Sequence, residues 1–360
     1  MFKATPRASG YLRTGYAEDF ALVGTRLERA SLLVFMLVLL LFPLVASAFQ
    51  LDLACQVFLA TIGSLSLMLL TGYCGQISLG HAGLLAAGAF TVGILFREAH
   101  APFWITLPLA AVVGGVLGVI FGLPSLRLRG LYLAVSTLAL HFVVIYLGGE
   151  YESKRGFSTG IMIDPPAIGG YEIASPRVWY FILLSAVAAA LLICVNLMRS
   201  RTGRAWRAIR DHETVAEALG IGIAGYKVLA FVISSAMTAV AGALFAYYRN
   251  FVSVEAFSLF LTIQYAAMII IGGMGSLLGA LLGAVFVTVF PYIIEAGLMA
   301  LPGAQRYANM LFAVNYAAFG VVMIVFLIFE PLGLVGIWRR IQSYFLQWPF
   351  KHRPVGGSRK

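Results

Sequence analysis

The chain has 360 residues, of which 61% are hydrophobic and only 11% are charged, and its mean hydropathy is +0.92. A soluble domain has about 25% charged residues, so this composition all but excludes a soluble enzyme. It also excludes a disordered chain, which lacks apolar mass, and three cysteines exclude a disulfide scaffold. The net charge of +10 would indicate nucleic-acid binding in a soluble protein, but here it is typical of basic cytoplasmic loops.

Eight stretches lack Asp, Glu, Lys and Arg and are long enough to cross a membrane. Two of them, 53–96 and 256–294, have double length, with glycine-rich breaks at 71–76 and 272–276. The six others have the length of one span: 30–51, 99–126, 130–149, 178–198, 228–248 and 307–329. The sequence therefore predicts an all-α integral membrane protein, a polytopic bundle of about ten transmembrane helices with glycine-broken helices. The first double run alternatively holds one span and a re-entrant segment.

Basic residues are divided unequally between the two sides that ten spans define. Nineteen of the 25 Lys and Arg residues lie on the side of both termini, and six lie on the other. Because cytoplasmic loops carry an excess of basic residues, both termini are predicted to be cytoplasmic. The predicted parts are an N-terminal segment 1–29, a transmembrane domain 30–337 with an outer loop 148–177 and a cytoplasmic loop 199–227, and a basic tail 338–360. The outer loop is interpreted either as a connector or as a docking surface or gate.

The cytoplasmic loop 199–227 contains a short amphipathic segment. Its apolar residues recur at roughly helical spacing, with charges between them: Trp206, Ile209, Val215, Ala216 and Leu219. The pattern breaks near Asp211, and Asp211 or Thr214 is predicted to cap a second short helix that ends at Gly220. One interpretation is a helix that rests on lipid. The other is a coupling helix that inserts into the groove of a partner protein.

This loop resembles the coupling loop of permease subunits of bacterial ATP-binding-cassette importers. More closely, it and the next span resemble the LivM-type high-affinity branched-chain amino acid permease family, in TGRAWRAIRDHETVAEALGIGIAGYKVLAFVISSAMTAVAGALFAY (202–247). Further blocks agree in order: LLTGYCGQISLGHAGLLAAGAF (69–90), LRGLYLAVSTLAL (128–140), IIIGGMGSLLGALLGA (269–284) and FEPLGLVGIWRR (329–340). The resemblance runs from about 53 to 340. In the outer loop, residues 155–160 keep only part of the family's Thr-Gly-Gly-Ser-x-Gly run.

The resemblance implies a permease of the bacterial inner membrane that is part of the path for branched-chain or similar small polar amino acids. It implies cytoplasmic ABC ATPase subunits, a second related permease, a periplasmic or lipid-tethered binding protein and membrane lipid as partners, and no nucleic acid. The chain itself would hold no cofactor, because ATP is used by the partner ATPases. The residues implied in coupling to the ATPase are Arg207, Glu213, Glu217, Ala218, Leu219 and Gly220.

The residues also bear on the energy source of transport. The chain lacks the phosphate-binding loop Gly-x-x-x-x-Gly-Lys-Ser/Thr, so an ATPase would have to be another polypeptide. No predicted span contains an acid, because the nearest ones lie at span ends: Asp52, Glu150, Glu255 and Glu295. This disfavours proton coupling, whereas sodium coupling through carbonyls remains open. The alternative functions are a self-sufficient secondary transporter or channel for small polar solutes, including urea or amides, and a membrane scaffold.

Polar residues inside the predicted spans are candidates for the substrate path. Gln76, Ser78 and His81 lie beside the first glycine-rich break, where a broken helix exposes backbone groups that bind a zwitterion. Thr137 and His141 lie four residues apart on one helical face. The alternative is that these side chains bond neighbouring helices, as is predicted for Gln264 and Asn315.

Two glycine series are interpreted as helix-packing faces. Each repeats every four residues, which lets two helices approach closely: Gly114, Gly118, Gly122 and Gly275, Gly279, Gly283. The three cysteines are predicted to be free thiols. The histidines form no pattern typical of a metal site, and no catalytic triad is recognised, so the chain is predicted not to be an enzyme.

Overall fold

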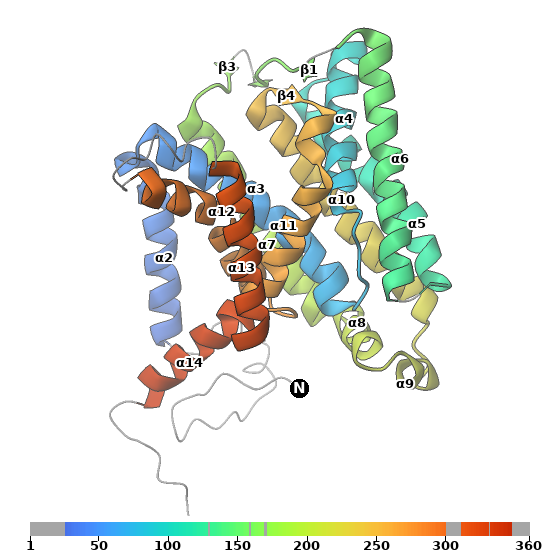
Figure 1. Ribbon diagram of the computed structural model, residues 1–360, viewed down its shortest axis with the longest axis vertical. Coiled ribbons are helices and arrows are strands. Elements are labelled where there is room, and N and C mark those ends of the chain that lie inside the picture. Colours follow the sequence, from blue (N-terminus) through green and yellow to red (C-terminus); the bar gives the residue numbers. More distant parts are fainter. Residues whose placement is uncertain are drawn as a thin grey trace, which may run out of the picture.

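The computed structural model describes residues 26–128, 130–157, 160–168, 171–299, 311–330 and 332–347 (Figure 1). Most of the predicted segments 1–29 and 338–360 therefore lie outside the described residues. The remainder of both belongs to helices, because α2 begins at Arg26 and α14 ends at Gln347.

The described residues are almost entirely helical, as predicted for a polytopic membrane protein. The first helices are α2 (Arg26–Val45), α3 (Ala48–Leu67) continued by the π-helix η1 (Met68–Tyr73), α4 (His81–Ala99), α5 (Phe103–Gly122), η2 (Leu123–Leu126), α6 (Leu131–Arg155) and α7 (Pro176–Arg199). Then follow α8 (Arg201–Asp211), α9 (Glu213–Ala218), α10 (Ile223–Arg249), η3 (Val254–Phe257), α11 (Leu259–Gly272), α12 (Leu277–Met299), α13 (Leu311–Phe329) and α14 (Gly333–Gln347).

The count of about ten spans is approximate. Seven described helices are long and apolar enough to cross a membrane, or eight if the bent pair α13 and α14 is one span. Both double-length runs divide into two helices at their glycines, as predicted. The second run is uneven, because α11 has 14 residues and α12 has 23.

Several helices extend beyond the uncharged runs that predicted them. The run 130–149 becomes α6, whose last turns carry an ion pair between Lys154 Nζ and Glu150 Oε1 at 3.0 Å. Such pairs, one helical turn apart, stabilise a helix end that projects beyond the apolar region. The helix stops at Gly156, which takes the left-handed conformation with a φ of 73°.

The buried centre of the bundle is built from α3, α4 and α10. Helix α10 packs against α3, α4 and α5, while α11 and α12 pack on each other (Figure 1). Short strands lie at the end of the bundle opposite α8 and α9. There β1 (Ile161–Met162) pairs antiparallel with β4 (Phe251–Val252), and β2 (Ala167–Ile168) pairs with β3 (Tyr171–Glu172).

Glycines set the closest helix approaches. A Cβ at Gly114 would lie 2.7 Å from the carbonyl oxygen of Ser235, and one at Gly118 would lie 2.8 Å from that of Phe231, both in α10. A Cβ at Gly122 would lie 3.1 Å from Phe231 Cβ. The sequence analysis missed Gly88 and Gly242, where α4 and α10 touch backbone to backbone.

The second glycine series is only partly helical. Gly279 and Gly283 lie in α12 and face the backbone of α11. Gly275 lies before α12, in the turn after α11, with a φ of 80°. Assigning Gly275 to a helical packing face was therefore wrong, because its left-handed backbone makes the turn that begins the next helix.

Candidate functional site

The loop predicted to be amphipathic forms two helices, α8 and α9, at one end of the bundle (Figure 1). Ser200 begins α8, where its hydroxyl accepts the amide hydrogen of Thr202 at 3.2 Å. The apolar face of α8 is buried: the indole of Trp206 is fully enclosed, and its Nε1 donates to the carbonyl oxygen of Tyr226 at 2.8 Å. A helix whose tryptophan donates its indole N–H to a neighbouring helix packs against the protein.

The join between α8 and α9 differs from the prediction. His212 is the extended residue between the two helices, with φ −154° and ψ 102°, and neither Asp211 nor Thr214 caps α9. Asp211 still belongs to α8, and Thr214 already belongs to α9. Gly220 does follow the second helix, with a φ of 82°, as the predicted helix stop requires.

A buried ion pair fastens α9 to α10. Lys227 Nζ lies 2.5 Å from Glu213 Oε1, and the Lys227 side chain is only 3% exposed. An ammonium group buried this deeply needs a carboxylate partner, because burying a charge alone costs several kcal/mol. Glu213 thus has a structural contact within the chain.

The predicted coupling residues divide into two groups. Arg207 turns back into the bundle, where its guanidinium donates to the carbonyl oxygens of Gly203 at 3.1 Å and Met198 at 3.2 Å. Glu213 is held by Lys227. The other four are exposed at the tip of α9: Glu217, Ala218, Leu219 and Gly220. Leu219 is 75% exposed and Val215 is 55% exposed, so the tip presents apolar side chains that none of the described residues covers.

The first glycine-rich break is a non-helical stretch, residues 74–80, between η1 and α4. Gln76 and Ser78 are buried in it, and both bond locally. Gln76 Nε2 donates to the carbonyl oxygen of Cys74 at 3.4 Å, and Ser78 Oγ accepts the amide hydrogen of Gly80 at 3.3 Å. These side chains therefore shape the break itself in this conformation.

Two threonines from other helices satisfy backbone amides where α4 begins. Thr137 of α6 accepts from the amide of Leu79 at 2.9 Å, and Thr262 of α11 accepts from that of Ala82 at 3.0 Å. The residue before α4 is Gly80, which has no side chain to cap it. Sequence reasoning found Thr137 but missed Thr262, whose role depends on a contact 180 residues away.

The two candidate histidines contact different neighbours of α4. The ring of His81 packs edge-on against Tyr265 of α11, with the ring centroids 4.7 Å apart. His141 packs at Gly83, where a Cβ would lie 3.0 Å from its Nδ1. Both side chains are buried, and His81 Nε2 and His141 Nδ1 have no hydrogen-bond partner among the described residues. The five candidates thus surround the start of α4 rather than forming one row.

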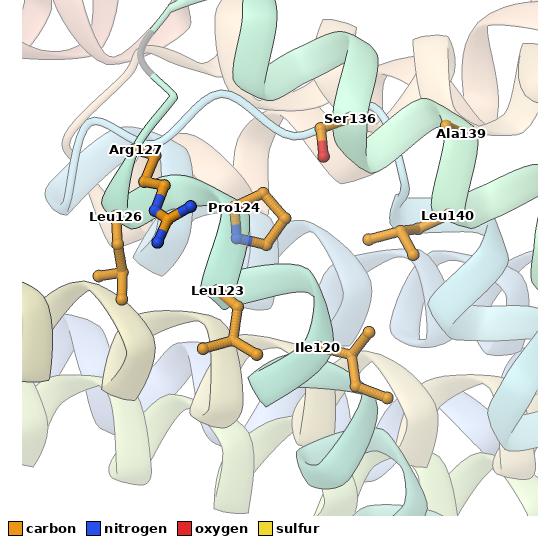
Figure 2. A pocket seen from close by; sticks show the side chains of 8 residues that line it. All are labelled: Ile120, Leu123, Pro124, Leu126, Arg127, Ser136, Ala139 and Leu140. Atoms are coloured by element: carbon orange, nitrogen blue, oxygen red, sulfur yellow. The ribbon is translucent and has the colours of Figure 1, made fainter.

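Two hollows in the described part of the chain lie elsewhere. Figure 2 shows one of about 640 Å³ between the α5–η2 end and α6, where Arg127 and Ser136 lie among apolar side chains. A second, of about 540 Å³, is an apolar groove among α5, α7 and α10. Neither is lined by the five substrate-path candidates. Asn315 was expected to bond a neighbouring helix, but its buried Oδ1 has no hydrogen-bond partner in the part of the chain that the structure describes.

Comparison of the sequence with known proteins identifies the family of the chain. Residues 49–328 match the family model of the permease component of the branched-chain amino acid transport system. The chain belongs to this family. It is 30% identical over 344 residues to the permease protein LivM of the high-affinity branched-chain amino acid transport system of Escherichia coli (strain K12), covering 89% of this chain and 78% of LivM.

More distant relatives belong to another importer. The LsrC permease protein of the autoinducer 2 import system of Enterobacter sp. (strain 638) is 26% identical over 209 residues, covering 56% of this chain and 58% of LsrC. No solved structure matches the chain. The protein is therefore a multi-pass permease subunit of the ATP-binding-cassette importer type, and its relatives are transport permeases. Such permeases work with ATPases and a substrate-binding protein.

Proposed function

We propose that this chain carries branched-chain or similar small polar amino acids across the bacterial inner membrane as one of two related permeases. A periplasmic or lipid-tethered binding protein delivers the amino acid, and cytoplasmic ATPases use ATP, for which this chain has no site of its own. The names of the LivM relatives, which match over most of their length, support this substrate class.

The exposed tip of α9 is the proposed contact with an ATPase subunit. It is the observation that carries the proposal: a rigidly held helix pair ends in uncovered apolar side chains, Val215 and Leu219. The tip is fastened at its base by the pair of Lys227 and Glu213. A surface that is apolar at its tip and fixed at its base suits the groove of a partner. This contact requires α8, α9 and both termini to be cytoplasmic.

The proposed substrate path passes the start of α4. A helix that begins inside the bundle directs its amide groups and positive dipole end toward the break, which suits the carboxylate of an amino acid. Gln76, Ser78, Thr137, His81 and His141 supply polar atoms there. ATP binding would move the α8–α9 pair and shift the bundle between two states. Each state exposes these polar atoms to one side of the membrane.

The test is reconstitution of the complete importer. The chain is purified in mild detergent with its partner subunits, which mass spectrometry identifies, and is placed in liposomes with the binding protein. Uptake of labelled leucine, isoleucine or valine should require both ATP and the binding protein. Uptake by the chain alone, without ATP, would overturn the proposal in favour of a secondary transporter or channel.

The α9 contact is tested by two matched variants. Leu219→Glu places a charge on the exposed tip and should abolish copurification of the ATPases. Met162→Glu makes the same change at an equally exposed apolar residue at the other end of the bundle, where Met162 is 62% exposed. It should retain the ATPases, and their equal loss in both variants would refute the assignment of α9.

A further inference from the structure

Arg210, the penultimate residue of α8, lies at the end of the bundle with its side chain 40% exposed and its Nε 3.9 Å from Asp211 Oδ1. Its guanidinium contacts the end of η1, directly before the first glycine-rich break. Its Nη1 donates a hydrogen bond to the carbonyl oxygen of Gly72 in η1. The last carbonyls of a helix have no partner within it and carry partial negative charge, so a cation is favourable there. Arg210 thus caps the end of the α3–η1 span from a different helix. The coupling residues implied by family resemblance did not include it.

The same side chain lies against the second break. A Cβ at Gly275, in the turn between α11 and α12, would lie 2.5 Å from Arg210 Nη1. A Cβ at Gly75 would lie 3.1 Å from Arg210 Cγ. The turn geometry already requires glycine at both positions, which have φ values of 80° and 74°. Because Gly75 and Gly275 have no side chains, the Arg210 side chain fits against both.

The two breaks touch each other directly beside Arg210. The amide of Gly275 donates to Met68 Sδ at 3.2 Å, and a Cβ at Gly72 would lie 3.1 Å from the Gly275 nitrogen. The ends of two broken spans, far apart in the sequence, therefore meet at one arginine. That arginine belongs to the helix pair that carries the exposed α9 tip.

We infer that Arg210 is a latch that holds the two helix breaks together and passes movement of the α8–α9 pair to them. The inference rests on the proposed coupling role of α9. When the α8–α9 pair moves, the guanidinium leaves the Gly72 carbonyl, and the ends of the two broken spans are free to separate. Arginine suits this position better than lysine, because Nη1 lies at Gly72 and Gly275 while Nε lies 3.9 Å from Asp211 Oδ1, whereas an ammonium group makes a single point contact. Arg210 is a positioning residue, since it acts through the breaks.

The first test measures the breaks without any partner subunit. Cys74 is fully buried and lies two residues after Gly72, so its reaction with a membrane-impermeant maleimide reports opening at the first break. In a chain whose other cysteines are alanine (Cys55→Ala, Cys194→Ala), Arg210→Gln should raise the labelling rate of Cys74 about five-fold or more in inside-out vesicles. Arg204→Gln is the control, because Arg204 is an exposed residue of α8 that bonds the nearby carbonyl of Arg199.

A labelling rate of Cys74 that is equal in Arg210→Gln and in the parent would overturn the inference. A companion chain that keeps only Cys55, which is also fully buried but lies near the other end of the α3–η1 span, is labelled with the membrane-permeant N-ethylmaleimide in parallel with the Cys74 chain, which separates local opening from general loosening. If Arg210→Gln raises the labelling of Cys55 and Cys74 alike, the arginine is a general structural residue and the latch is wrong.

The second test uses the complete importer in liposomes and measures amino acid moved per ATP hydrolysed. Arg210→Gln should lower this ratio about ten-fold while ATP hydrolysis continues, and Arg210→Lys should lie between it and the parent. If the parent is active and Arg210→Gln moves as much amino acid per ATP as the parent, the latch is wrong but the proposed function stands. A parent complex without ATP-driven uptake would instead overturn the proposed function on which the latch depends.

Discussion

Lys227 and Glu213 form an ion pair across the join between α9 and α10, with Lys227 Nζ 2.5 Å from Glu213 Oε1. The lysine lies in the second turn of α10, directly before the part of that helix that packs against α3, α4 and α5. The glutamate is the first residue of α9. The pair therefore fixes α9 to α10, so that movement of the exposed α9 tip is passed to α10.

Removing the lysine charge should weaken this connection. Lys227→Met keeps the length and apolar stem of the side chain but removes the ammonium group from the buried pair with Glu213. Breaking a buried pair from one side costs about 3 kcal/mol, so we expect a clear fall in the thermal unfolding midpoint of the detergent-purified protein. Amino acid uptake should fall further than stability alone explains, because α9 is no longer fixed.

An exposed pair in the same chain is the control for this prediction. Lys154→Met removes the partner of Glu150 at the end of α6, where both side chains are largely exposed. Exposed pairs contribute about 0.5 kcal/mol, so this variant should unfold close to the parent. Equal midpoints for Lys227→Met and Lys154→Met would show that the buried pair adds nothing.

Glycine packing between α5 and α10 gives a second prediction. Gly114→Ala places a Cβ 2.7 Å from the carbonyl oxygen of Ser235 and should force the helices apart, at a cost of about 1–3 kcal/mol. The neighbouring Gly115→Ala is the matched control, because its Cβ would lie 3.8 Å from Val232 Cγ1, at ordinary contact distance. We expect thermal unfolding to separate the two variants, with Gly115→Ala at least as stable as the parent. The reverse order would contradict the packing described for this face.

Local patterns in the sequence were enough to predict most of the fold. Uncharged runs located the apolar helices, and glycine clusters located both helix breaks, because these signals depend only on neighbouring residues. Boundaries were less accurate where charged turns extend a helix, as at Glu150 and Lys154. Gly275 was misplaced, since spacing alone does not reveal a positive φ.

Long-range contacts explain what the sequence did not reveal about the site. Thr262 caps the start of α4 from a helix far along the chain, and Arg210 reaches Gly72 across 138 residues. In isolation, Thr262 resembles any threonine of an apolar helix, and Arg210 resembles one more basic residue of a basic loop. The helical spacing of Trp206 predicted an apolar face for α8. It did not predict Tyr226 as the residue that the indole of Trp206 contacts.

The threonine caps of α4 lead to a third prediction. Thr137→Val and Thr262→Val each remove one acceptor for a buried amide, so each should cost about 1–3 kcal/mol of stability. Thr91→Val is the control, because Thr91 Oγ1 only donates to the carbonyl of Ala87 within its own helix. Thermal unfolding of the three variants is the measurement. If Thr91→Val destabilises as much as the other two, the caps have no special role at the start of α4.

A variant of His81 tests whether this residue contacts the substrate or only packs against a neighbouring helix. The His81 ring packs against Tyr265, and its Nε2 is buried with no hydrogen-bond partner from the described residues. His81→Phe keeps an aromatic ring for that packing and removes the polar nitrogens. If Nε2 faces the substrate during transport, uptake should fall about ten-fold, the loss expected when one hydrogen bond to a charged group is removed.

The readout of the His81 variant has to exclude damage to the fold. Tyr265→Phe keeps the ring contact with His81 and removes only the phenol oxygen. It therefore serves as the matched control for a polar atom lost from the other ring of the pair. The thermal midpoint and the ATP hydrolysis rate of His81→Phe should stay close to those of the parent, because the packing is retained. Normal uptake by His81→Phe would mean that the histidine is a packing residue. The amino acid would then have to be sought among Gln76, Ser78 and the amides of the first break.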